Sequence, residues 1–150
     1  MAKRRDIGDT SSAGFKRILV PTDLTDRAAR ALELAIALAA GRGSRITLLH
    51  VVETVRGLEF DELRRFYKQL EERGRAKMAA LVRRAGDGPI NQAVVYGARA
   101  EEIVRFATRN RTDLIVLASH RVKPNMIGRD WGTISYKIGI LAQCPVLLVK

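Results

Sequence analysis

The 150-residue sequence has little cysteine, few aromatic residues and no long apolar run. Its single cysteine, Cys144, excludes an internal disulfide and is typical of a protein from a reducing compartment. No apolar stretch reaches the roughly 20 residues that a membrane-spanning helix needs, and no apolar segment of signal-peptide type follows the charged start. We therefore expect a cytoplasmic protein that does not enter the membrane.

Motifs of several common enzyme classes are missing as well. The chain has no G-x-x-x-x-G-K-[ST] segment, so a P-loop kinase or ATPase is not supported. The stretch Gly41–Gly43 resembles part of a dinucleotide fingerprint but stands between a predicted helix and a predicted strand, which is the reverse of the required order. Neither His50 nor His120 has partners at the spacing of a triad or a metal cluster. We expect no dedicated catalytic residues and no metal site.

Positive charge is what the sequence has in excess. Twenty-seven Lys and Arg against 16 Asp and Glu give a formal charge of +11. Such a field attracts polyanions without regard to their sequence. Many of the basic residues alternate with acids, as in DELRRFYKQLEERGRAK, which is typical of a solvated helix face. We expect non-specific polyanion binding, and a nucleic-acid-associated protein stays as one alternative function.

Five apolar runs alternate with helical patterns. Residues 1–14 are predicted to be a flexible basic tail, and residues 15–150 one domain. Strands are expected at residues 15–21, 44–52, 90–96, 112–118 and 145–149, and helices at 25–41, 63–81 (apolar at Phe66 and Tyr67, interrupted at Gly74), 97–110 and 132–142. Strict alternation of strands and helices predicts an α/β fold with a parallel sheet covered on both faces.

Asp23 follows the first predicted strand, after Pro21 and Thr22. In open parallel sheets, ligands bind at the carboxyl ends of the strands, where the strand order reverses. The carboxylate of Asp23 can accept hydrogen bonds from a ribose or an adenine amino group. An Asx-turn or a helix cap is an equally good interpretation of the same residue, and both stay open.

The loop after the fourth strand is ASHRVKPNMIGRDWGTIS. Its last residues resemble a phosphate-binding loop, and its first residues do not. Gly132 and Thr133 start a predicted helix whose N-terminus attracts phosphate, and Ser135 adds a hydroxyl. Upstream, where glycine amides would converge on phosphate oxygens, the loop has Ala118, Arg121 and Pro124. Its cations, which can replace the lost backbone dipoles, are Arg121, Lys123 and Arg129.

Together these segments resemble a universal stress protein domain. The resemblance rests on RILVPTDLTDRAARALELAIALA, ITLLHVV, VVYGARAEEIVRFA, DLIVLASH and CPVLLVK, and runs from about Phe15 to Lys150. It implies a five-stranded parallel sheet in the order 3-2-1-4-5 with helices on both faces, an adenine-nucleotide-hydrolase-like sandwich. It also implies a stress-response module that is commonly a homodimer, in a family with one branch that binds ATP and one that does not.

In the ATP-binding branch, the loop after the fourth strand has the motif G-x2-G-x9-G-[ST], where x is any residue. Here Ala118 and Arg121 occupy the first two glycine positions, and ten residues separate Arg121 from Gly132. The resemblance therefore implies an altered site for ATP or another adenine nucleotide, with Mg²⁺ only as its companion. The residues that it assigns to this site are Pro21, Thr22, Asp23, Val51, Arg121, Gly132, Thr133 and Ser135. An ATP-binding switch with slow or no hydrolysis is the alternative function.

The last predicted strand, Pro145 to Val149, is short, apolar and at the edge of the expected sheet. Edge strands tend to be covered or paired. We expect this strand to pair with its copy in a second chain.

Overall fold

The computed structural model describes residues 14–86, 88–121 and 133–150. Strands and helices alternate, as predicted. The strands are β1 (Arg17–Thr22), β2 (Arg45–Glu53), β3 (Ile90–Gly97), β4 (Leu114–Ala118) and β5 (Val146–Val149); the helices are α1 (Asp26–Ala39), α2 (Arg64–Ala85), α3 (Arg99–Arg109) and α4 (Ile134–Leu141), with a 3-10 turn at Phe60–Leu63. All but one residue of the predicted tail, 1–14, lies outside the described residues.

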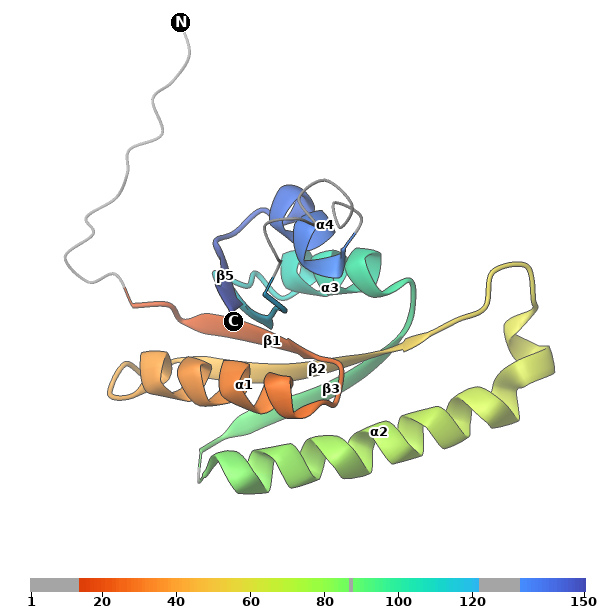
Figure 1. Cartoon of the computed structure of the whole chain (residues 1–150), viewed down its shortest axis with the longest axis horizontal. Coiled ribbons are helices and arrows are strands. Elements are labelled where there is room, and N and C mark those ends of the chain that lie inside the picture. Colours follow the sequence, from red (N-terminus) through yellow and green to blue (C-terminus); the bar gives the residue numbers. More distant parts are fainter. Residues whose placement is uncertain (1–13, 87, 122–132) are drawn as a thin grey trace, which may run out of the picture.

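The strands form one parallel sheet in the order β3-β2-β1-β4-β5, which confirms the predicted fold. Figure 1 shows α1 and α2 on one face of the sheet and α3 and α4 on the other. One apolar cluster, around Leu32, packs α1 and α2 on the sheet, and a second, around Ile138, packs α3 and α4. Because successive side chains of a strand point to opposite faces, Ile18 and Leu19 belong to different clusters. Among the described residues, no helix is long and apolar enough to cross a membrane.

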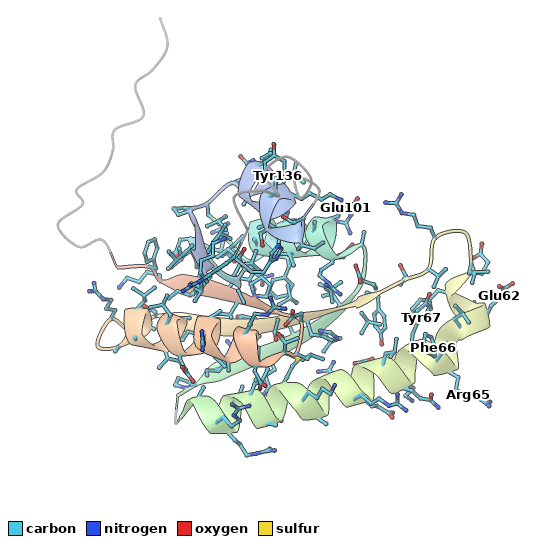
Figure 2. All side chains as sticks on the ribbon, in the orientation of Figure 1. Glu62, Arg65, Phe66, Tyr67, Glu101 and Tyr136 are labelled. Atoms are coloured by element: carbon cyan, nitrogen blue, oxygen red, sulfur yellow. The ribbon has the colours of Figure 1, made fainter. Side chains whose placement is uncertain are left out.

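Helix α2 differs from the prediction in two respects. It runs without interruption through Gly74, where a Cβ would lie 2.8 Å from Cδ2 of His50 on β2. The glycine therefore lets the helix approach the sheet closely. Tyr67 is buried on the sheet side of the helix, whereas Phe66, predicted on the same apolar face, is 50% exposed (Figure 2). Adjacent residues of a helix point about 100° apart, and Tyr67 takes the buried position.

Tyr67 ties α2 to the end of β2. Its ring is 1% exposed, and its hydroxyl oxygen accepts a hydrogen bond from the Val55 N–H at 2.8 Å. We expect Tyr67→Phe to lower the free energy of unfolding by about 1 kcal/mol, because the Val55 N–H loses its partner while the ring stays packed. Urea unfolding of the two proteins measures this difference. An unchanged midpoint would show that water replaces the hydroxyl at no cost.

Candidate functional site

The carboxyl ends of β1 and β4 part at the point where the strand order reverses. The register joins Ile18 to Leu114 and Leu19 to Ile115. Two residues beyond Leu19, Pro21 has no N–H to donate to a neighbouring strand. A cleft of about 200 Å³ opens between the two strand ends. This is the position at which open α/β sheets bind ligands.

The cleft has an apolar part and a polar part. The apolar part comes from the strand ends and from α3 and α4, and the polar part comes mainly from the connecting segments. Its apolar lining residues are Pro21, Leu49, Val51, Ile103, Leu117, Ala118 and Ile134; its polar ones are Thr22, Asp23, Arg27, Arg99, Ser119, His120, Thr133 and Ser135. Residues more than 100 positions apart in the sequence therefore meet in one cavity.

Asp23 forms the Asx-turn that was one of its two interpretations. Its Oδ1 accepts hydrogen bonds from the Thr25 N–H at 3.0 Å and from the Thr25 hydroxyl at 2.5 Å. Leu24, between them, has φ +66°, a left-handed conformation that costs a residue with a side chain roughly 1 kcal/mol. Within the part of the chain that the structure describes, Oδ2 of Asp23 makes no hydrogen bond. The turn thus fixes the carboxylate at the cleft and leaves one oxygen for a ligand.

Helix α4 begins at the opposite side of the cleft. Thr133 is its N-cap: the Thr133 Oγ1 accepts a hydrogen bond from the Tyr136 N–H at 3.3 Å. The N–H groups of Ile134 and Ser135 are in the first turn, where a helix offers them no carbonyl partner. Two backbone donors and the hydroxyl of Ser135 therefore stand at the positive end of a helix dipole, an arrangement that suits an anion.

The structure brings most of the predicted site residues together. Those that line the cleft are Pro21, Thr22, Asp23, Val51, Thr133 and Ser135. Gly132 lies outside the described residues, as do Lys123, Pro124 and Arg129. Arg121 lines a separate hollow next to the cleft.

Arg99 is a cleft residue that the sequence analysis missed. It begins α3 two residues after Gly97, whose φ of +144° and whose missing Cβ, which would lie 2.7 Å from Cγ of Glu102, require glycine. The Arg99 guanidinium forms an ion pair with Glu53 at 2.8 Å. The sequence signal for Arg99 was its position two residues after Gly97, the glycine at the end of the third strand. Arg27, Ser119 and His120 were also missed.

The charges of the cleft favour an anionic ligand that also carries hydrogen-bond donors. Among its described lining residues, Asp23 is the one carboxylate, and two arginines, Arg27 and Arg99, line the same cleft. Within residues 14–86, 88–121 and 133–150, no three His, Cys, Asp or Glu gather as a metal site would require. The described residues therefore supply binding groups for a charged, hydroxylated molecule.

His50 supports the Asp23 turn from the other face of the sheet. Its Nδ1 lies 3.2 Å from the carbonyl oxygen of Thr22, which the Nδ1–H tautomer reaches as a donor. Burial lowers the pKa of His50 below 6.5, and the charges of Arg99 and Lys77 act in the same direction, while the Thr22 hydrogen bond and Asp23 oppose the shift. The neutral ring is therefore the form that the folded protein favours.

A lowered histidine pKa predicts a loss of stability in acid. Below 6.5 the unfolded chain binds the His50 proton before the folded protein does, so the free energy of unfolding falls as the pH drops through this range. We expect His50→Asn to flatten the dependence of the unfolding free energy on pH between about 5 and 6.5. Urea unfolding at several pH values measures it, with His120→Asn as the same exchange at an exposed position. A pH profile that His50→Asn leaves unchanged would contradict this assignment.

Comparison with known proteins identifies the fold and the chain's relatives. The sequence model described as "Universal stress protein family" matches residues 14–150. The chain belongs to the universal stress protein family. A universal stress protein of Thermus aquaticus, from the 3' region of a QAH/OAS sulfhydrylase gene, is 32% identical over 141 residues, which cover 91% of this chain and 99% of the relative.

Solved universal stress proteins have the same architecture. The structure of MJ0577 from Methanocaldococcus jannaschii has a TM-score of 0.72 at 26% identity, over 92% of this chain and 97% of that one. A universal stress protein solved in complex with cAMP has a TM-score of 0.67 at 19% identity, over 92% of this chain and 99% of that one. The predicted family and sheet order of this universal stress protein are thus confirmed.

Proposed function

We propose that this universal stress protein is a regulatory binding module that holds an adenine nucleotide in the cleft between the ends of β1 and β4. The observation that carries the proposal is the convergence of Asp23, Val51 and Thr133 on one cavity of about 200 Å³. These residues come from the ends of β1 and β2 and from the start of α4, so only the folded sheet assembles them.

Each part of a nucleotide has a matching group in the cleft. The flat base fits the apolar lining, which includes Val51 and Leu117. The ribose hydroxyls are donors for Oδ2 of Asp23, and a carboxylate at this position of an α/β sheet commonly takes that role. The phosphate fits the N-terminus of α4, with Ser135 as an additional donor. The complex with cAMP shows that a protein of this fold holds an adenine nucleotide.

The size of the cleft favours a small nucleotide. Pockets for drug-sized ligands measure roughly 300–1,000 Å³, and this cleft is about 200 Å³. We propose that it accepts the nucleoside and one phosphate, with Mg²⁺ only as a companion of longer phosphate chains. AMP is therefore the first ligand to test, and ATP the second.

Calorimetric titration tests the proposed function. We expect AMP to bind saturably with a dissociation constant on the order of micromolar, and ribose 5-phosphate to bind at least about 30-fold more weakly, because it lacks the base that fills the apolar lining. The titration is run with and without Mg²⁺ at physiological salt. Equal affinity for the two ligands would show that charge alone attracts them, and absence of saturable heat with AMP would end the proposal.

We also propose that the protein is a homodimer joined through β5. This strand is at the edge of the sheet, and Leu147 and Leu148 are 38% and 39% exposed on it. Three exposed apolar residues lie nearby in the sequence: Tyr136, Ile140 and Leu141. An apolar edge strand of this kind is normally covered, and a second copy of the chain covers it at low cost.

Sedimentation of charged variants tests the dimer. We expect the wild-type chain to sediment as a dimer at about 20 μM, and Leu148→Lys to sediment as a monomer, because a buried ammonium is costly at such an interface. Phe66→Lys places the same charge on an apolar residue that is 50% exposed on α2, and we expect it to stay dimeric. A monomeric wild-type chain, or dissociation by Phe66→Lys alone, would contradict the proposal.

The cytoplasm remains our proposed location. Cys144 is a half-buried thiol, and burial, followed by the charge of Asp113, raises its pKa. A thiol that resists ionisation is a poor nucleophile and fits a protein that keeps its one cysteine reduced. Cell fractionation tests the location.

A further inference from the structure

A basic hollow adjoins the cleft on the α1 side of the sheet. It measures about 140 Å³, and its lining includes four cationic side chains from three segments: Arg27 and Arg30 on α1, Arg121 after β4, and Lys150 after β5. The lining contains no Asp or Glu among the described residues. Four like charges around so small a space repel one another, and an anion between them removes the repulsion.

The four cations of the hollow have no acidic partner among the described residues. Elsewhere, arginines on α2 and α3 form ion pairs with nearby acids: Arg64, Arg75, Arg84, Arg99 and Arg105. Within the described part of the chain, none of the four cations of the hollow has an ion pair, and the terminal carboxylate of Lys150 lies within 4 Å of none of them. Of the two acids of α1, Asp26 pairs with Arg84 on α2 at 3.2 Å, and Glu33, three residues after Arg30, forms no ion pair with it. The charge of the hollow is therefore not the mixed charge of a solvated face.

Lys150 is held at the hollow by two hydrogen bonds. Its Nζ donates to Oγ of Ser119 at 3.2 Å and to the carbonyl oxygen of His120 at 3.1 Å. An ammonium has three donors, so one remains for a ligand. Ser119 is 8% exposed, and its buried hydroxyl fixes a long side chain that would otherwise be free to rotate. The cation is thus placed before any ligand arrives.

The hollow and the cleft are neighbouring cavities that share part of their walls. Three residues line both cavities: Arg27, Ser119 and His120. The cleft extends to residues of α3 and α4, such as Ile103 and Ile134, whereas the hollow is lined by Arg30 of α1 and by Val149 at the end of β5. A phosphate chain that starts in the cleft can pass Arg27 and end among the other three cations.

We propose that the basic hollow is a binding site for a phosphate chain, separate from the N-terminus of α4. Guanidinium groups bind phosphate oxygens through paired hydrogen bonds, and the Lys150 ammonium adds a point charge. Two sources supply this chemistry: free pyrophosphate, or the distal phosphates of a nucleotide whose base lies in the cleft. The second source rests on the proposed function, and the first does not.

Pyrophosphate is the probe for the hollow alone. We expect it to bind the full chain saturably at physiological salt, and Arg30→Gln and Lys150→Met each to raise its dissociation constant roughly tenfold or more, as the loss of one charge-assisted contact does. Neither residue lines the cleft. Arg83→Gln is the matched control, because Arg83 is an exposed arginine on α2 that lines neither cavity. It should leave the affinity within about twofold.

A second arm separates the two sources. ATP and AMP are titrated into the wild-type chain and into Arg30→Gln. If the nucleotide supplies the phosphates, the variant weakens the binding of ATP about tenfold and leaves the affinity for AMP unchanged. If free pyrophosphate is the ligand, the variant weakens the binding of pyrophosphate and leaves the affinities for both nucleotides unchanged. Pyrophosphate binding without any AMP binding would support the hollow and overturn the proposed function of the cleft.

The proposal fails on either of two results. The first is that neither Arg30→Gln nor Lys150→Met changes the affinity for pyrophosphate or for ATP. The second is that Arg83→Gln weakens binding as much as they do, which would show that only the net charge of the protein attracts the anion. Thermal unfolding of each variant confirms that it is folded, as expected for exchanges at exposed positions.

Discussion

Replacement of Asp23 by Ala is expected to weaken AMP binding between about tenfold and a hundredfold, because a carboxylate that accepts hydrogen bonds from ribose hydroxyls is worth a charge-assisted pair. The variant also loses the turn in which Oδ1 binds the N–H and the hydroxyl of Thr25. The loss of such a turn costs about 1 kcal/mol of stability, so the protein stays folded. Calorimetry with AMP gives the affinity, and urea unfolding gives the stability.

Two further variants separate the turn from the ligand contact. Thr25→Val removes one hydrogen bond of the turn and leaves the Asp23 carboxylate, so AMP affinity should change less than about threefold. Asp23→Asn keeps an acceptor oxygen for the turn but removes the charge, and its affinity should fall between those of the wild type and Asp23→Ala. If Thr25→Val weakened AMP binding as much as Asp23→Ala does, the role of Asp23 would be only to shape the loop.

Replacement of Ile138 by Ala is expected to have the largest effect on stability. Ile138 is 0% exposed and is the one buried side chain of the eight-residue helix α4. Removal of three methyl or methylene groups from a packed core costs about 2–5 kcal/mol. Because α4 also carries Ser135, AMP affinity should fall with the stability of the helix. Urea unfolding and AMP titration on one sample measure both effects.

Ile140 provides the control for Ile138. It lies two residues further along α4, and it is 61% exposed. Both exchanges are made in the Leu148→Lys chain, which we expect to be monomeric, so that Ile140 stays exposed. Ile140→Ala should then change the unfolding free energy by less than about 0.5 kcal/mol and leave AMP affinity intact. Because Ala has a higher helix propensity than Ile, equal effects of the two variants would mean that the packing of Ile138 does not hold α4 on the sheet.

The fold was predictable because its signals are local. Five apolar runs alternate with amphipathic helices, and this pattern alone implies a parallel sheet covered on both faces. Asp23 and Thr133 were predictable for the same reason, since each stands where a strand ends or a helix begins. The two interpretations of Asp23 were not separable from the sequence, because a turn acceptor and a ligand acceptor need the same residue at the same place.

Other features depend on distances across the fold. Nothing local distinguishes Arg30 from the other arginines; its position beside Lys150 exists only when β5 lies next to β4. Gly74 was predicted to interrupt α2, but its role is to admit the ring of His50, which is 24 positions earlier in the chain (74 − 50). Arg99 needed the positive φ of Gly97 to reach the cleft. Pairings of this kind follow from topology and not from composition.

The most direct measurement is a heteronuclear NMR titration of the isotopically labelled protein with AMP. If the cleft binds the nucleotide, saturable shifts will appear at the amides of residues 22–25, at Val51 and at residues 133–135, and not at the exposed start of α2. Saturable shifts confined to other parts of the molecule, or no shifts at millimolar AMP, would contradict the assignment of this cleft as the nucleotide site.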